Sequence, residues 1–368
     1  MMKKRILAMV TTLVMAASLF AGCGVQSGDE GSSQQSGADS QQSGADSQQN
    51  DVSESGQTQD SKDGSGADIT DDTVIRVGGL KGPTSMGMAK LLTDAGNGAS
   101  RLNIEFSLAA TADELTPSLV QGNLDLLAVP SNLASVLYNN TEGAVRLLAV
   151  NTLGVLYIVD TKDSIGSVGD LKGKTILATG QGNTPEYTLN YILAKNGIDP
   201  AADVTIEWKS EAAEIVAAMA ASEEEVIAML PQPYVTVAQT QVEGLRIALD
   251  LNTEWENTDA ESGIVTGVMI ARTAFVEEHP ELIEAFLEEY QKSTEYVNAN
   301  VSEAAQMIEA LDIVKAAIAE KALPYCNITF MRDADMKTAV SKYLQVLYDQ
   351  NPKSVGGNLP DDAFYYTR

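Results

Sequence analysis

The sequence has few of the residues that carry most enzyme chemistry. It contains one histidine, His279, and two cysteines, Cys23 and Cys326, in 368 residues. A single histidine with no cysteine beside it does not make a metal-binding cluster. The chain also lacks the GxSxG, HExxH and P-loop motifs that mark several enzyme classes. We therefore expect no catalytic residues, no metal ligands and no cofactor.

Basic residues are also scarce. The chain carries 24 Lys and Arg against 51 Asp and Glu, so its formal net charge is −27. A surface this acidic repels the phosphates of nucleic acid and the headgroups of anionic lipids. Nucleic acid is therefore not expected as a partner. The acidic balance by itself identifies no ligand.

The only long apolar run lies at the N-terminus. Residues 1–5 are basic, Ile6 to Phe20 is apolar, and "AGC" follows at 21–23. The run is shorter than the ~20 residues that span a bilayer, and its pattern is that of a secretory signal peptide. A cysteine after Ala-Gly resembles a bacterial lipobox, although Phe20 stands where an aliphatic residue is usual. We expect residues 1–22 to be removed and Cys23 to be lipidated; an ordinary signal peptide with a coincidental cysteine is the alternative.

Residues 23–71 have a different composition from the rest of the chain. "QQSGADS" occurs at 34–40 and again at 41–47, among Gly, Ser, Gln and Asp. Such a segment buries too little apolar surface to offset its chain entropy, so we expect a disordered tether. A lipid and a tether would hold the folded body at the extracytoplasmic face of the cell membrane. Cys326 is then left without a disulfide partner and is expected to be a buried thiol.

The remaining residues, 72–368, exceed the ~250-residue size at which one core usually splits, so two domains are expected. Apolar segments at 73–80, 103–108, 124–129, 146–150, 174–178 and 204–208 predict strands, with helices between them. Repeated β–α units with short connections predict parallel sheets covered by helices. The fold class is α/β.

Polar residues follow several of these strands. "GLKGPTSMG" places Thr84 and Ser85 at the joint between the first strand and an expected helix over 85–95. Thr111 and Glu114 predict a capping box, in which each satisfies free N–H groups of the helix that ends at Val120. Thr184 is the predicted N-cap of a later helix, with Pro185 as its first residue.

Four segments together resemble a known family. They are "SVGDLKGKTI", "GQGNTPEYTLNYILAKNGID", "AMLPQPYVTVAQ" and "ARTAFVEEHPELIEAFLEEYQ". Their order is similar to that in the nitrate/taurine/sulfonate and thiamine-precursor group of substrate-binding lipoproteins of ABC importers. The resemblance covers nearly all of residues 73–350. It implies a two-lobe, type II periplasmic-binding-protein-like fold, with two crossover strands and a ligand cleft between the lobes. The first lobe would comprise 72–154 and 266–368, and the second 155–265.

The resemblance also implies where the ligand binds. In open α/β sheets, ligands bind beyond the carboxyl ends of the strands, where helix N-termini present free N–H groups. The expected contacts are Gly82, Thr84, Ser85, Thr111, Ser131, Asn132, Thr152, Asn183, Thr184, Gln232 and Tyr234. For several of them a structural role is open as well: Thr111 and Thr184 as caps, and Tyr234 as core.

The function that the resemblance implies is capture of a small polar organic molecule or anion. A monomeric, lipid-anchored binding protein would deliver this ligand to the permease and ATPase of an ABC importer. One alternative is an enzyme on the same fold, chorismate dehydratase-like or thiamine-pyrimidine synthase-like, although the synthases use a Cys-rich motif and histidines that this chain lacks. Another is a ligand-sensing lipoprotein. Lys81 is the main cation in the expected turns. This favours a neutral or weakly charged ligand, while a sulfonate or nitrate held by neutral donors stays open.

Overall fold

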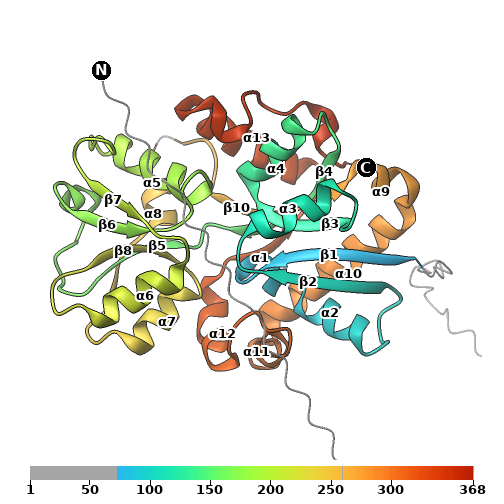
Figure 1. The fold of residues 1–368 in the computed structure, drawn as a ribbon, viewed down its shortest axis with the longest axis horizontal. Coiled ribbons are helices and arrows are strands. Elements are labelled where there is room, and N and C mark those ends of the chain that lie inside the picture. The colour runs from blue at the N-terminus through green and yellow to red at the C-terminus, as the bar shows by residue number, and fades with distance from the viewer. Residues whose placement is uncertain (1–72, 259, 368) are drawn as a thin grey trace, which may run out of the picture. The chain divides into compact units, whose positions relative to one another are not determined.

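The computed structural model describes residues 73–258 and 260–367. The predicted signal peptide, the lipidation site Cys23 and the tether lie outside the described residues. Strands and helices alternate along the described chain and build two separate sheets, each with its own helices (Figure 1). We call them the first and the second lobe.

The sheet of the first lobe has six strands in the order β11-β4-β10-β3-β1-β2. β1 is parallel to β2 and to β3, as the sequence predicts. β10 runs antiparallel to both β3 and β4, and β11 antiparallel to β4. The strands are β1 (Val74–Leu80), β2 (Asn103–Ala109), β3 (Leu126–Pro130), β4 (Val145–Leu153), β10 (Val265–Arg272) and β11 (Ile328–Met331).

The sheet of the second lobe has five strands in the order β7-β6-β8-β5-β9. β6 is parallel to β7 and β8, whereas β5 is antiparallel to β8 and β9. The strands are β5 (Leu156–Asp160), β6 (Thr175–Ala178), β7 (Thr205–Trp208), β8 (Ile227–Pro231) and β9 (Arg246–Asp250).

The expectation of wholly parallel sheets is wrong, and the crossovers explain why. The chain leaves the first sheet after β4, enters the second as β5, and returns to the first as β10. Each entering strand starts at the edge where its parallel neighbours end: Leu156 of β5 pairs with Pro231, and Gly267 of β10 with Pro130. A strand that crosses between lobes therefore runs against the strands it joins.

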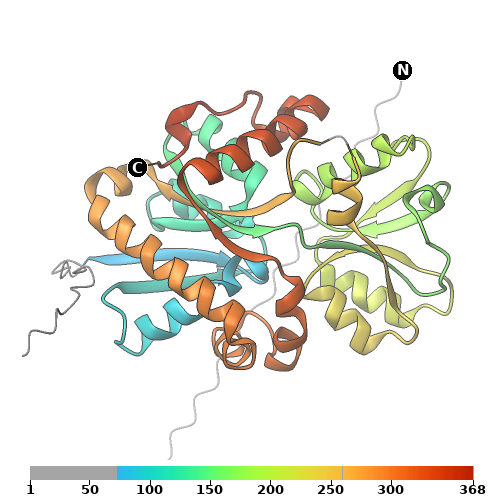
Figure 2. The same cartoon turned by 180° about the vertical axis from the view of Figure 1, so that it is seen from behind.

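Helices cover both faces of each sheet. In the first lobe α2 (Ala89–Gly96) and α10 (Pro280–Ala299) cover one face, and Figure 2 shows α10 running across it. On the opposite face lie α4 (Ser131–Asn140) and α13 (Asp333–Gln350). The other helices of the first lobe are α1 (Pro83–Met86), α3 (Ala112–Val120), α9 (Thr273–Glu278), α11 (Val301–Ala310) and α12 (Ala316–Ala322).

In the second lobe α5 (Thr184–Lys195) and α8 (Leu251–Glu256) cover one face. α6 (Ala212–Ala221) and α7 (Tyr234–Gln241) cover the other. One cluster of buried apolar side chains continues from α5 and α8 into α13 of the first lobe. The Trp255 and Tyr343 rings, 5.5 Å apart between centroids, are part of it. The lobes are therefore joined by a shared core on this side.

Several local expectations are confirmed. The Glu114 carboxylate accepts the backbone N–H of Thr111 at 2.9 Å, as a capping box requires. α10 begins at Pro280, directly after His279. Cys326 is a free, buried thiol, and burial raises its pKa to about 12. The predicted helix over 85–95 is instead two helices, because the chain turns at Gly87 and Met88 between α1 and α2.

No helix in the described part of the chain combines the length and the apolar character needed to cross a membrane.

Candidate ligand-binding groove

A groove of about 530 Å³ lies where the two lobes face each other. That volume is within the ~300–1,000 Å³ range of small-molecule sites. The first lobe lines it with the ends of β1, β2 and β3, and the second with the ends of β6, β7 and β8. The lining is Leu80, Lys81, Ala110, Thr111, Ala112, Asp113 and Pro130 from the first lobe, and Thr179, Gly180, Gln181, Asn183, Pro185, Trp208, Lys209, Ser210, Glu211, Ala212, Pro231 and Tyr234 from the second. We call it the ligand groove.

Three helices begin at the ligand groove. Their N-cap residues, Thr111 of α3, Asn183 of α5 and Glu211 of α6, all belong to its lining. The first N–H groups of a helix have no partner within the helix and carry partial positive charge. The groove therefore offers backbone donors from both lobes to an electronegative group on a ligand.

Charged groups of both signs line the ligand groove. Lys81 comes from the first lobe and Lys209 from the second, beside Asp113 and Glu211. Lys209 Nζ lies 3.3 Å from a carboxylate oxygen of Glu207, on the exposed surface. Two ammonium and two carboxylate groups make the charge of the lining balanced, in contrast to the strongly acidic chain.

Two rings stand at the second-lobe side of the groove, those of Trp208 and Tyr234. Burial and, to a lesser extent, the nearby Glu211 carboxylate raise the pKa of Tyr234 above its ordinary value of 10.0. The phenol is therefore neutral at physiological pH and can donate or accept a hydrogen bond.

The groove brings together three of the eleven predicted contacts: Thr111, Asn183 and Tyr234. Asn183, and not Thr184, occupies the N-cap position of α5, so the predicted cap is displaced by one residue. A hydrogen bond within the turn before α5 also stabilises it: the backbone N–H of Gly182 donates to the Glu186 carboxylate at 2.6 Å.

The hydroxyl-bearing turn after β1 packs into the first lobe. Ser85 is fully buried, and its Oγ occupies the space that a Cβ on Gly79 would need. The Thr84 methyl lies only 2.5 Å from the position of a Cβ on Gly267. The absence of a side chain at Gly79 and Gly267 thus makes room for Ser85 and Thr84. Gly82 precedes α1 with a positive φ of 147°, which favours glycine. None of Gly82, Thr84 and Ser85 lines the ligand groove.

Four more predicted contacts are engaged with the protein itself. The Ser131 hydroxyl donates to the carbonyl of Val265 at 2.5 Å, and the Thr152 hydroxyl to Asn151 Oδ1 at 3.0 Å. Asn132 and Thr184 bond to each other across the lobes, at 3.0 and 3.1 Å. All four are buried. In this arrangement they hold strands and lobes in place.

Gln232, the last predicted contact, does not line the ligand groove. Its side-chain oxygen accepts the hydroxyl of Thr236 at 2.9 Å and the backbone N–H of Thr236 at 3.3 Å. The residues on either side of this turn, Pro231 and Tyr234, do line the ligand groove.

The sequence model of the NMT1/THI5 like family matches residues 104–304, more than half of the 368-residue chain. The chain belongs to the NMT1/THI5 like family. The predicted resemblance to this group of binding proteins is therefore confirmed. No curated protein matches the sequence.

Several solved protein structures superpose on this chain and share its fold. An ABC transporter protein from Parabacteroides distasonis superposes with a TM-score of 0.68 at 23% identity, over 81% of this chain and 100% of that one. The periplasmic aliphatic sulphonate binding protein SsuA from Escherichia coli gives 0.64 at 17% identity, over 80% and 92%. CA3427 from Candida albicans, described as having the generic periplasmic binding protein fold, gives 0.54 at 15% identity, over 79% and 93%. The predicted two-lobe periplasmic-binding-protein-like fold is confirmed.

The turn after β7 also reaches the ligand groove, although none of its residues is among the expected contacts. Trp208, Lys209, Ser210 and Glu211 all line the ligand groove there. "WKSEAAE" is a strand end followed by a helix start, as are the turns after β1, β3 and β6. Their position beyond a strand end is the sequence signal that marks these residues as candidate ligand contacts.

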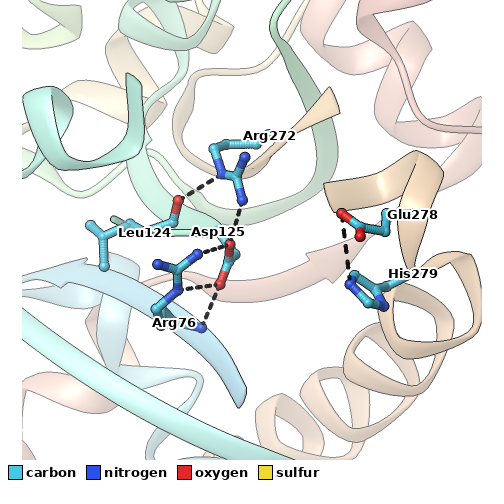
Figure 3. Close-up of polar contacts among 6 residues, drawn as sticks. All are labelled: Arg76, Leu124, Asp125, Arg272, Glu278 and His279. Atoms are coloured by element: carbon cyan, nitrogen blue, oxygen red, sulfur yellow. Dashed lines mark hydrogen bonds and ion pairs between the residues drawn. The ribbon is translucent and has the colours of Figure 1, made fainter. Parts of the chain in front are cut away.

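A charge cluster of the first lobe, drawn in Figure 3, lies outside the ligand groove, and none of its residues belongs to the groove lining. Asp125, just before β3, accepts hydrogen bonds from Arg76 Nε at 2.8 Å and from an Arg272 terminal nitrogen at 2.7 Å. Burial raises the pKa of Asp125, but the bonds from both arginines outweigh burial and the pKa is lowered overall. The cluster ties β1, β3 and β10 together at the amino ends of the parallel strands. Figure 3 also shows His279, whose Nε2 lies 4.0 Å from a carboxylate oxygen of Glu278.

Proposed function

We propose that this member of the NMT1/THI5 like family is an extracytoplasmic solute-binding protein. It captures a small polar molecule in the ligand groove and delivers it, unaltered, to the permease and ATPase of an ABC importer. The observation that carries the proposal is the groove itself. It is of ligand size, is lined from both lobes, and is bordered by the N-termini of α3, α5 and α6.

The ligand contacts in this proposal are Thr111, Asn183 and Tyr234, joined by Lys81 and Lys209. The first two lie at helix starts on opposite lobes, and the lysines also come one from each lobe. Closing of the lobes on a ligand would place both sets on one molecule, and binding would shift a pre-existing equilibrium between open and closed forms.

The chemistry of the lining favours a molecule with little net charge. Two ammonium groups stand against two carboxylates, and the rings of Trp208 and Tyr234 offer apolar area. The SsuA protein that shares the fold is described as binding aliphatic sulphonates. Sulfonates therefore belong among the compounds to test, together with pyrimidines, nitrate and amino acids.

The attachment to the membrane is also part of the proposal. Cys23 would carry a lipid after removal of residues 1–22, and residues 24–71 would be the tether. The protein would act as a monomer at the extracytoplasmic face. The lobe boundaries predicted after residues 154 and 265 stay a prediction.

A thermal-shift screen over these four compound classes tests the proposal. A ligand present at 100 times its dissociation constant adds about 2.7 kcal/mol to the free energy of unfolding. The bound compound is then recovered and analysed by mass spectrometry. Recovery of an unaltered compound supports a binding protein, whereas recovery of a converted product supports an enzyme on this fold. If no compound from the four classes raises the melting temperature, the proposal that the groove binds such a molecule is contradicted.

A further inference from the structure

A second groove, also of about 530 Å³, lies between α7 and the end of α12. The second lobe contributes the turn after β8, α7 and β9 to its walls. The first lobe contributes α12 and the short turn Leu323–Tyr325. We call it the α7–α12 groove. It shares no lining residue with the ligand groove and is of a size that holds a small molecule.

The α7–α12 groove bridges the lobes. The Tyr157 hydroxyl of β5 donates to the backbone carbonyl of Tyr325 at 3.3 Å, which ties the first-lobe wall to the second lobe. A molecule in this groove therefore touches both lobes at once, as a molecule in the ligand groove does.

A buried amide faces this groove. Gln232 is 2% exposed and belongs to the lining. Because a backbone N–H can only donate, the atom that meets the N–H of Thr236 must be the side-chain oxygen of Gln232, which fixes the orientation of the amide. The amide nitrogen is then left as a donor, and no described residue accepts a hydrogen bond from it. This nitrogen is not among the fully buried, unpaired polar atoms of the described chain, so it reaches solvent and can donate to a molecule in the groove.

The other walls add one positive charge and apolar area. Lys321 is the only charged side chain among the described residues that line the groove. Tyr325 is 56% exposed and Ile247 37%, which places both among the four exposed large hydrophobic residues of the described chain. A cation, an amide donor and an apolar wall together match an organic anion with a flat apolar body.

We propose that the α7–α12 groove is a second binding site, which takes a small aromatic carboxylate. The carboxylate meets Lys321 and the Gln232 amide, and the ring packs against Tyr325 and Ile247. Because the site spans both lobes, an occupant stabilises the lobe arrangement that brings Tyr325 to Tyr157. This site goes beyond the proposed transport function, since its lining differs from that of the ligand groove in charge and in every residue.

Naphthoate is the probe for this site, and naphthamide is its neutral counterpart. A probe of this size binds with a dissociation constant on the order of 1 mM, which ligand-observed NMR and calorimetric titration both detect. Naphthoate should bind the parent protein about threefold more tightly than naphthamide, as expected for one exposed ion pair. Lys321→Gln should abolish that difference, and Tyr325→Ala should weaken both compounds.

Lys209→Gln is the matched control, because Lys209 lines the other groove. This variant should keep the preference for naphthoate. Lys321 is exposed and Lys209 partly exposed, and melting curves of all variants test that they fold. Loss of the preference in Lys209→Gln but not in Lys321→Gln would place the probe in the ligand groove and overturn the second site. Equal binding of naphthoate and naphthamide, or no saturable binding of either, would also overturn it, and both results leave the proposed function untouched.

Discussion

Asn132 in α4 receives both hydrogen bonds that Thr184 can donate. Its side-chain oxygen lies 3.0 Å from the backbone nitrogen of Thr184 and 3.1 Å from the hydroxyl. Its side-chain nitrogen donates to the carbonyls of Ser354 at 3.1 Å and Gly182 at 3.3 Å. Three of these four bonds join the first lobe to the turn that carries Asn183 into the ligand groove, and the fourth, to Ser354, stays within the first lobe.

Replacing this amide should weaken both folding and ligand binding. Asn132→Ala removes these bonds and leaves buried partners behind, which we expect to cost about 2–3 kcal/mol of unfolding free energy. Gly180, Gln181 and Asn183 of this turn line the groove, so the dissociation constant of a ligand should rise about tenfold. Denaturant titration and calorimetric titration measure the two effects separately.

Asn139 supplies the control for that experiment. It lies in the same helix, and its side chain donates to the carbonyls of Val355 at 2.8 Å and Asn358 at 2.7 Å, away from α5. Asn139→Ala should lower stability and leave the affinity unchanged. Equal affinity losses in both variants would show that Asn132 has no specific effect on the groove.

The packing of the turn after β1 predicts that Gly79 and Gly267 tolerate no Cβ. Gly267→Ala would meet the Thr84 methyl at 2.5 Å, and Gly79→Ala would meet the Ser85 hydroxyl and the Phe106 ring. Each should cost about 1–3 kcal/mol, as overpacking does in other cores. The exposed Gly263 has nothing within 4 Å of its Cβ position, and Gly263→Ala should be nearly neutral. Thermal unfolding compares the three, and a melting temperature unchanged by Gly267→Ala would refute this packing.

The Asp125 cluster predicts how stability depends on acid. The folded-state pKa of Asp125 lies below its ordinary value of 3.8. A lowered pKa contributes stability that is present above the unfolded-state pKa and is lost as the pH falls toward the folded-state pKa. Asp125→Asn should therefore destabilise the protein by about 3 kcal/mol at neutral pH and make its stability less sensitive to pH below about 4.

Asp163 provides the comparison for Asp125. Its carboxylate lies 2.7 Å from Arg246, but its side chain is 84% exposed. Exposed ion pairs contribute little, so Asp163→Asn should change neither the stability nor its pH dependence noticeably. An acid-unfolding curve of Asp125→Asn that overlays the parent curve would contradict the assigned role of the Arg76–Asp125–Arg272 cluster.

Membrane attachment predicts a simple localisation result. Cys23→Ser should move the protein from the membrane fraction to the soluble fraction, because a lipid on Cys23 is the only anchor that the sequence suggests. Fractionation followed by immunoblotting measures it. A variant that stays as membrane-bound as the parent would rule out lipid attachment at this cysteine.

Local sequence signals predicted much of the fold. Thr111 and Glu114 predicted the start of α3, and Pro280 predicted the start of α10. The apolar run before Pro130 predicted β3. Each signal depends on neighbours within a few residues. The short edge strands β9 and β11 were not predicted from such local signals. They are fixed by antiparallel pairing with β5 and β4, which lie far from them in the sequence.

The candidate site was harder to predict than the fold. A hydroxyl after a strand end has the same sequence signature whether it faces a groove or the core. The Ser85 side chain packs into the core because Gly79 leaves room for it. Thr184 donates hydrogen bonds to Asn132, which lies 52 residues earlier in the sequence. These pairings depend on how the two lobes pack. Thr111, Asn183 and Tyr234 reach the groove because the helices after them start at its border.

The central claim is that the ligand groove binds one small molecule through residues of both lobes. Calorimetric titration of the compound found in the screen, with the parent and with Thr111→Val/Asn183→Ala/Tyr234→Leu, tests it most directly. Loss of three neutral hydrogen bonds, at about 0.5–1.5 kcal/mol each, should weaken binding at least about tenfold. The triple variant must first show a cooperative melting transition. Full affinity in a folded triple variant would contradict the account, because the ligand would then bind elsewhere.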